Sequence, residues 1–134
     1  MIFIRPNVLR LTFSALRHFS TSSLKPTTYH ALFYDYVPNI LEKRVPYRQD
    51  HFKHITNLVE KGHCQFGGAW GTDEDSLNDQ VDGALIILKD MSKNEIEDFV
   101  KKDPYFINGL VPNYRIRPWN VVVGAAIKYY FIQM

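Results

Sequence analysis

The sequence predicts an α+β fold in which two helices pack on one face of a four-stranded antiparallel sheet, with the elements in the order βαββαβ. Two segments with helical signals, residues 46–61 and 92–102, alternate with four short segments of strand-like composition. This alternation is typical of an α+β sandwich, because each helix needs a sheet face on which to bury its apolar stripe. With 134 residues, 46% of them hydrophobic, the chain suits one compact domain.

The first strand is expected over residues 27–36, which are rich in β-branched and aromatic side chains. Pro38-Asn39 breaks this strand. Tyr34 lies near its C-terminal end, where a pocket could open.

The first helix follows a lead-in over residues 41–45, and Pro46 is tolerated in its first turn. One continuous stripe runs along this helix, formed at helical spacing by Tyr47, His51, Ile55 and Leu58. His51 should therefore lie on or beside the buried face. Gly62 is expected to end the helix.

The second and third strands are expected over residues 64–71 and 83–88. Glycines at positions 67, 68 and 71 weaken the second strand as a regular strand. Their presence is better explained by a bulge or by the close approach of another group. Residues 72–82 carry five acids and few apolar side chains, so they should form a solvated, mobile loop. The glycine placement of an EF-hand loop is absent there, which argues against calcium.

A capping box, Ser92-Lys93-Asn94-Glu95, opens the second helix. Ile96, Phe99 and Val100 form the stripe that should face the sheet. Asp103 precedes a proline, which pushes its backbone out of the helical region and therefore ends this helix.

A turn at Gly109 and Pro112-Asn113 leads to the last strand. In this strand Tyr114, Ile116 and Pro118 alternate with Arg115, Arg117 and Trp119, as expected when one face is buried. Since Pro118 has no N–H for a ladder, the strand should lie at an edge of the sheet or end there.

Several of these motifs together resemble the signature of the YciI-like (YCII-related) family. They are, in chain order, Leu41-Glu42-Lys43-Arg44, Arg48-Gln49-Asp50-His51-Phe52, Gly62, Gly67-Gly68, Asp103-Pro104-Tyr105, Gly109-Leu110 and Ile116-Arg117-Pro118-Trp119. Their order and spacing agree with the family from Tyr29 to Val123. The resemblance implies a ferredoxin-like βαββαβ domain of the dimeric α+β barrel type, with a pocket that holds a histidine and an aspartate.

On the residues that match these motifs, the resemblance implies that His51 and Asp103 are catalytic. An imidazole beside a carboxylate makes a general base, because the acid fixes the tautomer and stabilises the imidazolium. The expected substrate-binding residues are Tyr34, Arg48, Gly67, Gly68, Tyr105 and Trp119. The two glycines could bring backbone N–H groups to a ligand oxygen, and the aromatic side chains could wall a pocket. Taken one by one, His51 and these aromatic residues would more often be core residues.

Composition and motifs argue against several other function classes. A net charge of +2, without a long basic run, gives no support for nucleic-acid binding. The single cysteine, Cys64, excludes an internal disulfide and a multi-cysteine zinc site, and it suggests a reducing compartment. His51 and His54 lack the further ligands of a zinc site, and the chain has no phosphate loop. We expect no metal and no cofactor.

Residues 1–23 are predicted to be a mitochondrial transit peptide. No acidic residue occurs before Asp35, whereas Arg5, Arg10 and Arg17 are spread among apolar residues and precede Ser20-Thr21-Ser22-Ser23. A secretory signal would need an unbroken apolar run; an ordinary amphipathic surface helix is the alternative. The expected location is the mitochondrion, with the matrix favoured.

Residues 24–123 should form the YciI-like domain, and residues 124–134 an apolar C-terminal tail. The fourteen residues from Val121 to Met134 carry one charge, Lys128, and are fewer than the ~20 that span a bilayer as a helix. We therefore expect no transmembrane segment. The stretch is predicted to pack in a homodimer that also buries the open face of the sheet.

Two functions remain open. One is a small enzyme that uses His51 and Asp103 for proton abstraction in an elimination, isomerisation or hydrolysis of a small polar or aromatic metabolite. The other is a non-catalytic module that keeps the fold and the dimer in order to bind a small ligand or another protein. The intact histidine–aspartate pair favours the enzyme, whereas the tail and the acidic loop favour the module.

Overall fold

A computed structural model describes residues 25–125 of the chain. Its elements, in chain order, are β1 (Tyr29–Asp35), α1 (Ile40–Lys43), the 3₁₀ helix η3 (Val45–Tyr47), α2 (Arg48–Glu60), β2 (Cys64–Trp70), α3 (Ser76–Asp79), β3 (Gly83–Lys89), α4 (Lys93–Lys102), α5 (Pro104–Ile107) and β4 (Asn113–Trp119). None of the helices in this part of the chain is long and apolar enough to cross a membrane. The predicted leader, and the predicted tail from residue 126 onward, lie outside the described residues.

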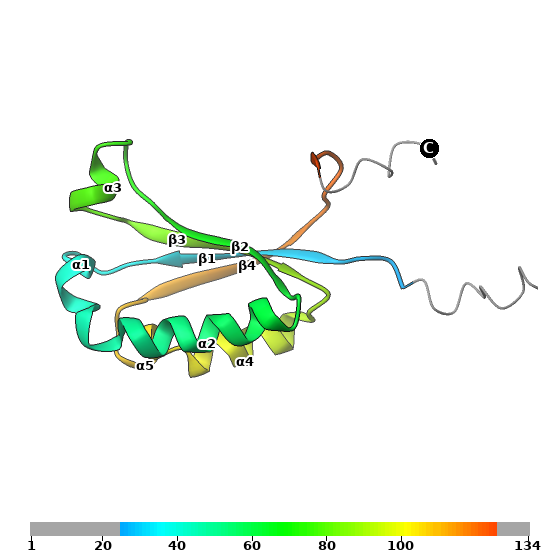
Figure 1. The fold of residues 1–134 in the computed structure, drawn as a ribbon, viewed down its shortest axis with the longest axis horizontal. Coiled ribbons are helices and arrows are strands. Elements are labelled where there is room, and N and C mark those ends of the chain that lie inside the picture. Colours follow the sequence, from blue (N-terminus) through cyan, green and yellow to red (C-terminus); the bar gives the residue numbers. More distant parts are fainter. Residues whose placement is uncertain (1–24, 126–134) are drawn as a thin grey trace, which may run out of the picture.

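The four strands form one antiparallel sheet in the order β2-β3-β1-β4, and the two long helices α2 and α4 cover one of its faces (Figure 1). The crossover through α2 joins β1 to β2, and the crossover through α4 joins β3 to β4. Each crossover therefore bridges two strands that have a third strand between them. The predicted ferredoxin-like βαββαβ sandwich is confirmed, and so is the edge position of β4.

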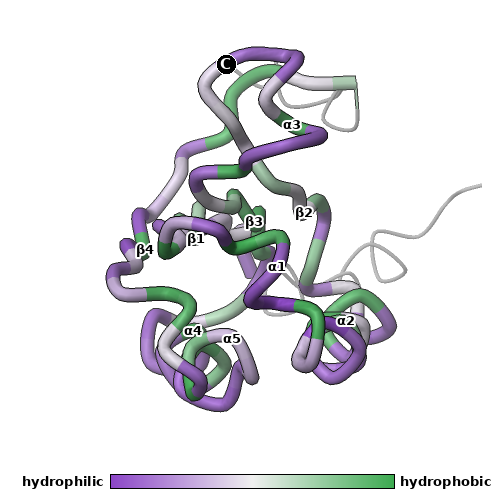
Figure 2. The backbone as a smooth tube through the Cα atoms, turned by 90° about the vertical axis from the view of Figure 1, so that its left-hand side faces the viewer, coloured by the Kyte–Doolittle hydropathy of each residue, from purple (hydrophilic) through white to green (hydrophobic). Residues whose placement is uncertain are grey.

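The core fills the space between the sheet and the helices. Figure 2, an end-on view, shows α2 beside α4 and α5 under the sheet, with α3 on the opposite side of the sheet. The side chains that are most completely buried include Leu32, Ile40, Leu88, Ile96 and Val100. Burial stabilises each side chain of this size by roughly 1.5–3 kcal/mol relative to exposure. Hydrophobic burial is therefore the main force that holds the helices on the sheet.

The first helical segment differs from the prediction of one continuous helix. Pro46 lies in the 3₁₀ helix η3, and α2 begins only at Arg48. A proline has no N–H to donate into an α-helical ladder, so it is accommodated in the preceding tighter turn. His51 is buried as predicted. Gly62 follows the last helical turn with a φ of 76°, a left-handed conformation that favours glycine, so its predicted place is confirmed.

The structure also differs from the prediction at Asp103, where the sequence predicted only the end of a helix and a turn. Asp103 is the C-cap of α4 and also the N-cap of a further short helix, α5. Its Oδ1 accepts a hydrogen bond from the Tyr105 backbone N–H at 2.9 Å. Pro104 occupies the first helical position, where a missing N–H costs nothing. The sharp turn between α4 and α5 fixes the direction of the Asp103 side chain.

The glycines of the second strand have two different explanations. At Gly71 a Cβ atom would collide with the first side chain of α3, so the predicted close approach is confirmed there. The bulge lies between Cys64 and Phe66, before the glycines. Gly67 and Gly68 have room for a Cβ atom, and no protein atom crowds them. At these two positions the structure therefore shows neither a bulge nor a close approach of protein atoms, and the predicted approach of a ligand stays a prediction.

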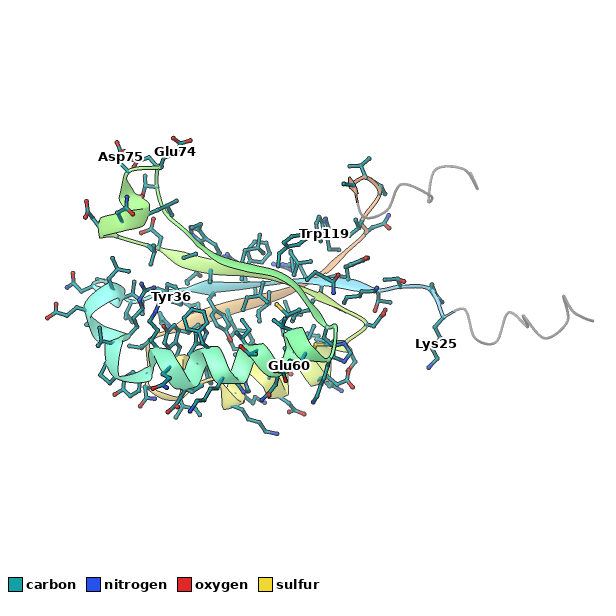
Figure 3. All side chains as sticks on the ribbon, viewed as in Figure 1. Lys25, Tyr36, Glu60, Glu74, Asp75 and Trp119 are labelled. Atoms are coloured by element: carbon teal, nitrogen blue, oxygen red, sulfur yellow. The ribbon has the colours of Figure 1, made fainter. Side chains whose placement is uncertain are left out.

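The acidic connection over residues 72–82 is exposed along most of its length, as predicted for a solvated segment. It also contains the one-turn helix α3, which the sequence did not predict. The side chain of Asp73 accepts a hydrogen bond from the Ser76 backbone N–H at 2.9 Å, and this local bond nucleates the turn. In Figure 3 the labelled Glu74 and Asp75 mark the tip of this connection, away from α2.

Candidate active site

The carboxylate of Asp103 is fully buried at the junction of α4 and α5, and three groups donate hydrogen bonds to it. Its Oδ1 accepts from the backbone N–H of Tyr105 at 2.9 Å and from His51 Nδ1 at 2.7 Å. Its Oδ2 accepts from the Tyr34 hydroxyl at 2.9 Å. A carboxylate taken out of water needs such partners, because burying an unpaired charge is very costly.

The helix α2 brings His51 to this carboxylate although 52 residues separate the two in sequence. Since Asp103 Oδ1 is an acceptor, the proton of the neutral imidazole lies on Nδ1 and the lone pair on Nε2. Among the described residues, no group forms a hydrogen bond with His51 Nε2, and the residue lines a cavity. The arrangement is that of a base whose tautomer is set by a carboxylate.

Tyr105 fixes the plane of the imidazole. The rings of His51 and Tyr105 are stacked, with centroids 3.8 Å apart and planes 3° from parallel. Tyr105 is 2% exposed, and no described residue accepts its hydroxyl proton. Burial raises the pKa of Tyr105, and the guanidinium groups of Arg44 and Arg48 only partly oppose this effect. The hydroxyl therefore keeps its proton at neutral pH and can donate it to an acceptor.

Tyr34 supports the site from behind. It is fully buried and does not line the cavity, so its predicted role in substrate binding is corrected to one in positioning Asp103. Burial raises the pKa of Tyr34 well above its usual value, and the Asp103 carboxylate acts in the same direction. Tyr34 therefore remains a hydroxyl donor to Asp103 throughout the neutral range.

A cavity of about 440 Å³, which we call the His51 cavity, lies between α2 and the sheet. Its apolar wall is formed by Ile55, Ala84, Ile86 and their neighbours, and its polar side chains besides His51 include Tyr36, Arg44, Arg48 and Tyr105. Gly67 and Gly68 border it from β2, which is an edge strand. An edge strand leaves alternate N–H groups without a strand partner. The volume is that of a typical site for a small molecule.

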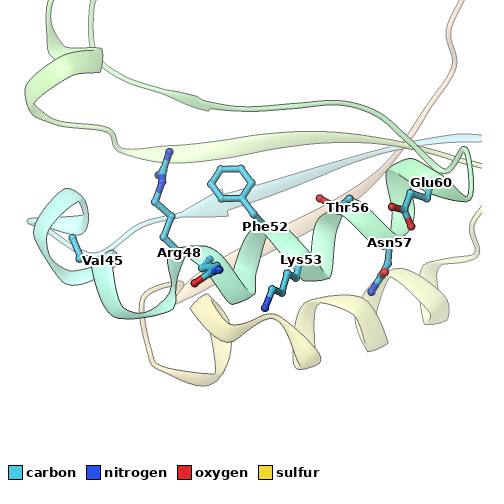
Figure 4. A pocket seen from close by; sticks show the side chains of 8 residues that line it. Val45, Arg48, Phe52, Lys53, Thr56, Asn57 and Glu60 are labelled. Atoms are coloured by element: carbon cyan, nitrogen blue, oxygen red, sulfur yellow. The ribbon is translucent and has the colours of Figure 1, made fainter.

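A larger hollow of about 850 Å³ runs along the exposed side of α2. Its lining residues, all exposed, are Val45, Arg48, Gln49, Phe52, Lys53, Thr56, Asn57 and Glu60. Figure 4 shows that Arg48 and Phe52 point from α2 towards the sheet, whereas Lys53 points away from it. This outer hollow contains no buried titratable group, so the chemistry of the molecule is concentrated in the smaller His51 cavity.

Residues 28–120 match the sequence model of the YCII-related domain. The chain belongs to the YCII-related domain family. The family indicated by the sequence motifs is thereby confirmed.

The chain is similar in sequence to one protein and in structure to another. Fusaric acid biosynthesis protein 2 from Gibberella moniliformis (strain M3125 / FGSC 7600) is 28% identical over 85 residues, which cover 62% of this YCII-related chain and 82% of the relative. The solved structure of 5-chloro-2-hydroxyhydroquinone dehydrochlorinase from Burkholderia phenoliruptrix AC1100, in complex with 2,5-dihydroxybenzoquinone, matches with a TM-score of 0.57. That match has 23% identity and covers 70% of this chain and 95% of the other. It supports a ferredoxin-like fold of the dimeric α+β barrel type.

The YCII-related domain brings most of the predicted site residues together. Five of the eight line the His51 cavity: Arg48, His51, Gly67, Gly68 and Tyr105. Asp103 and Tyr34 lie directly behind His51, linked to it through hydrogen bonds.

Trp119 is the exception among the predicted site residues. It lies on the side of the sheet opposite α2 (Figure 3), where it makes an edge-to-face contact with Tyr29 and lines a separate hollow of about 390 Å³. Successive side chains of a strand point to opposite faces, which places Trp119 with Arg115 and Arg117 on the face without long helices. The prediction that Trp119 walls the same pocket is corrected.

Several residues that line the His51 cavity were not predicted as site residues, and Tyr36, Arg44, Phe52 and Cys64 are among them. Arg44 and Arg48 are four residues apart, and this spacing was a usable signal that both reach one side of the helical segment. Burial raises the pKa of Tyr36, and the neighbouring Tyr105 and Asp103 act in the same direction. Burial also raises the pKa of the Cys64 thiol, so this cysteine has no sign of an activated nucleophile.

Within residues 25–125, no group of three or more histidine, cysteine, aspartate or glutamate side chains is arranged to hold a metal ion. His54 and His63 bond instead to backbone carbonyl groups, those of Phe99 at 2.7 Å and Lys89 at 2.8 Å. These two histidines therefore connect secondary-structure elements.

Proposed function

We propose that this YCII-related protein is an enzyme that moves a proton on a small cyclic metabolite, with His51 as the base and Asp103 as the residue that orients it. The observation that carries the proposal is the 2.7 Å contact between His51 Nδ1 and Asp103 Oδ1 at the wall of the His51 cavity. A base, a carboxylate that orients it, and a space for substrate are the parts that general-base catalysis requires.

In the proposed reaction, His51 Nε2 takes a proton from a carbon next to a carbonyl group of the substrate. The electrons of the C–H bond form an enolate, while the Asp103 carboxylate stabilises the imidazolium. In an elimination, the enolate re-forms the carbonyl, a C=C double bond forms between the deprotonated carbon and its neighbour, and the leaving group departs from that neighbour as an anion. In an isomerisation, the imidazolium returns its proton to a different carbon. Both sequences balance in atoms and electrons with these residues alone.

The enolate oxygen would need hydrogen-bond donors. Gly67 and Gly68 border the cavity from an edge strand and leave space for a ligand next to their backbone. We assign to this oxyanion the one N–H group of the pair that does not bond to β3. Loss of one such donor lowers a rate by about 10²–10³-fold in other enzymes.

The substrate class is drawn from the size of the cavity and from the names of similar proteins. A cavity of about 440 Å³ accommodates a six-membered ring with oxygen substituents. The dehydrochlorinase is named for a chlorinated hydroxyhydroquinone and was solved with 2,5-dihydroxybenzoquinone. By analogy, we propose elimination or isomerisation on an oxygenated ring, which would make this protein a lyase or an isomerase.

We further propose that the protein acts as a homodimer in the mitochondrial matrix. The arginine-rich, acid-free N-terminal sequence supports import. Exposed aromatic side chains on the open face of the sheet, Phe66 at 74% and Trp119 at 47%, support a second copy that covers this face. N-terminal sequencing of the protein from its host tests the location, since an intact Met1 contradicts it. Light scattering on the purified protein tests the dimer.

Exchange with solvent deuterium tests the enzymatic proposal before the substrate is known. Six-membered cyclic ketones with hydroxyl substituents are incubated with the protein in D₂O, and exchange next to the carbonyl group is followed by proton NMR. The wild type should accelerate exchange of at least one compound. The His51→Gln variant should not, while a matched His63→Gln variant should. Equal exchange by the wild type and the His51→Gln variant would contradict the proposal.

A non-catalytic module that binds the same class of ligand is the second candidate. One observation favours it: His51 is only 7% exposed and stacks on Tyr105, as a structural histidine would. Ligands that bind in the His51 cavity without accelerated exchange of any compound would assign the protein to this second function.

A further inference from the structure

The hydroxyl of Tyr105 is a polar feature of the His51 cavity that proton abstraction does not use. Tyr105 is 2% exposed and lines the cavity, and the donor that acts on its hydroxyl oxygen is the Arg48 guanidinium, while no described residue accepts its hydroxyl proton. A buried hydroxyl whose proton has no acceptor loses a hydrogen bond to water that the protein does not replace. An acceptor atom on a bound ligand would restore that loss.

Two arginines line the same cavity next to this hydroxyl. Tyr36, Arg44, Arg48 and Tyr105 all line the His51 cavity, and both guanidinium groups act to lower the pKa of the two tyrosines. The Arg48 guanidinium lies 4.8 Å from the centre of the Phe52 ring, and Figure 4 shows both side chains pointing the same way. This cation–π contact helps to hold Arg48 in place.

Neither arginine is neutralised by the protein around it. The ion pairs among residues 25–125 join other side chains, so no carboxylate pairs with Arg44 or Arg48 in this part of the chain. The residues that line the His51 cavity include no aspartate and no glutamate. Asp103 lies behind His51, where three donors already bind it. The mouth of the cavity therefore carries a positive potential that attracts anions.

We propose that Arg44, Arg48 and the Tyr105 hydroxyl form an anion subsite that binds a carboxylate on the substrate ring. Guanidinium groups fit a carboxylate in a bidentate manner, and the tyrosine hydroxyl adds a third donor. The inference rests on the proposed function, because the same ring would present its C–H group to His51. The stacking of Tyr105 on His51, with centroids 3.8 Å apart, sets the subsite beside the base. The substrate class is thus an oxygenated cyclic carboxylic acid.

Binding of two matched probes tests the subsite. The probes are 2,5-dihydroxybenzoate and 2,5-dihydroxybenzamide, which share a ring and differ in charge, and calorimetry measures their affinity for the full chain at low salt. The carboxylate should bind more tightly by roughly tenfold, as expected for charge-assisted hydrogen bonds. The preference should weaken as salt is added, because Arg48 is exposed to solvent and Arg44 is partly exposed.

Variants identify the residues responsible. An Arg44→Gln, Arg48→Gln double variant should lose the preference for the carboxylate, and Tyr105→Phe should reduce it. Arg117→Gln is the matched control, because it removes the same charge from an exposed position on β4, outside the His51 cavity. Equal affinity for the two probes would overturn the proposal, as would a preference that survives in the double variant.

The His51→Gln variant separates this inference from the proposed function. It should lose deuterium exchange and keep the preference for the carboxylate. A wild type that prefers the carboxylate but catalyses no exchange would leave the subsite standing and remove the enzymatic function. A wild type that catalyses exchange without this preference would leave the enzymatic function standing and remove the anion subsite.

Discussion

Two histidines of α2, His51 and His54, occupy environments that are alike in packing and different in consequence. Each imidazole stacks on an aromatic ring, that of Tyr105 at 3.8 Å and that of Phe99 at 4.3 Å between centroids. Each also has one ring nitrogen 2.7 Å from an oxygen atom, a carboxylate oxygen of Asp103 for His51 and the Phe99 carbonyl oxygen for His54. Stacking and a short hydrogen bond are thus shared.

The two histidines differ in the partner and in what lies beside the ring. His54 uses Nε2 to bind a carbonyl in the last turn of α4, where carbonyl groups lack helical donors, and so ties α2 to α4. His51 uses Nδ1 to bind a carboxylate and lines a cavity, which His54 does not. A free second nitrogen next to open space therefore distinguishes a base from a structural histidine.

The largest expected effect separates these two residues directly. His51→Gln should lower the rate of deuterium exchange by roughly 10²–10⁴-fold, the usual contribution of a general base. His54→Gln should leave the exchange rate nearly unchanged and lower the free energy of unfolding by about 1 kcal/mol, the typical value of one hydrogen bond. NMR exchange and urea denaturation measure the two quantities. Similar rate losses in both variants would contradict the comparison.

Asp103→Asn tests the carboxylate that distinguishes the His51 environment. The amide can still cap α5 but carries no charge to stabilise the imidazolium, so exchange should fall by about 10²-fold or more. Loss of a charged acceptor should also reduce the free energy of unfolding by about 1.5–3 kcal/mol. Asp98→Asn is the control and should change neither quantity. Asp98 lies in α4, and the structure records no side-chain hydrogen bond or ion pair for it. A variant with the wild-type exchange rate would show that Asp103 does not assist His51.

Tyr34→Phe removes only the hydroxyl that donates to Asp103 Oδ2. The buried carboxylate would lose one of its three donors, so the free energy of unfolding should fall by about 1–3 kcal/mol. The ring itself should remain in place, because phenylalanine keeps the shape of the core. Denaturation in urea measures this effect. Unchanged stability would show that the hydrogen bond at 2.9 Å contributes little.

The raised pKa values of Tyr34, Tyr36 and Tyr105 predict how stability depends on alkaline pH. In the unfolded chain a tyrosine loses its proton near pH 10, whereas the folded protein retains these protons to higher pH. The contribution to stability is therefore fully present below about pH 10 and is lost as the pH rises above it. Unfolding free energies measured between pH 8 and pH 11 should show this decline, and Tyr34→Phe should make it shallower. A free energy of unfolding that does not fall over this pH range would contradict the predicted loss of stability.

The smallest expected effect concerns Cys64, at the far wall of the cavity. Burial raises the pKa of its thiol, so less of the reactive thiolate is present at pH 8 than in a free cysteine. Reaction with a disulfide reagent should be slower than for a small-molecule thiol, and a bound ligand in the His51 cavity should slow it further. Faster reaction than the free thiol would indicate activation and contradict this account.

Much of the fold could be predicted because its signals are local. The capping box at Ser92 is present with both of its hydrogen bonds, and Gly62 has the left-handed conformation that its position required. In β4 the alternation of apolar and charged residues predicted the strand, and Pro118 predicted its edge position. The same alternation places Trp119 on the face of β4 opposite the half-buried Tyr114 and Ile116, and therefore argues against its predicted place in the pocket.

Other features depend on contacts between distant residues. Asp103 before a proline can end one helix or cap the next, and local sequence supports both; the hydrogen bonds from Tyr34 and His51 fix the arrangement in which α5 forms. The pairing of His51 with Asp103 came from the motifs of the family, since no local pattern relates residues 52 positions apart. The hydroxyl proton of Tyr105, which no described residue accepts, has no sequence signal at all.

The central claim is that Asp103 holds His51 as the tautomer with its proton on Nδ1 and leaves Nε2 as a free base facing the cavity. Nitrogen-15 NMR of the two imidazole nitrogens tests it most directly, with His51→Gln used to assign the signals by their disappearance. We predict a protonated Nδ1 and an unprotonated Nε2 in the ligand-free protein, and a change in the Nε2 signal when 2,5-dihydroxybenzoate binds. A proton on Nε2, or an Nε2 signal that stays unchanged at saturating ligand, would contradict the account.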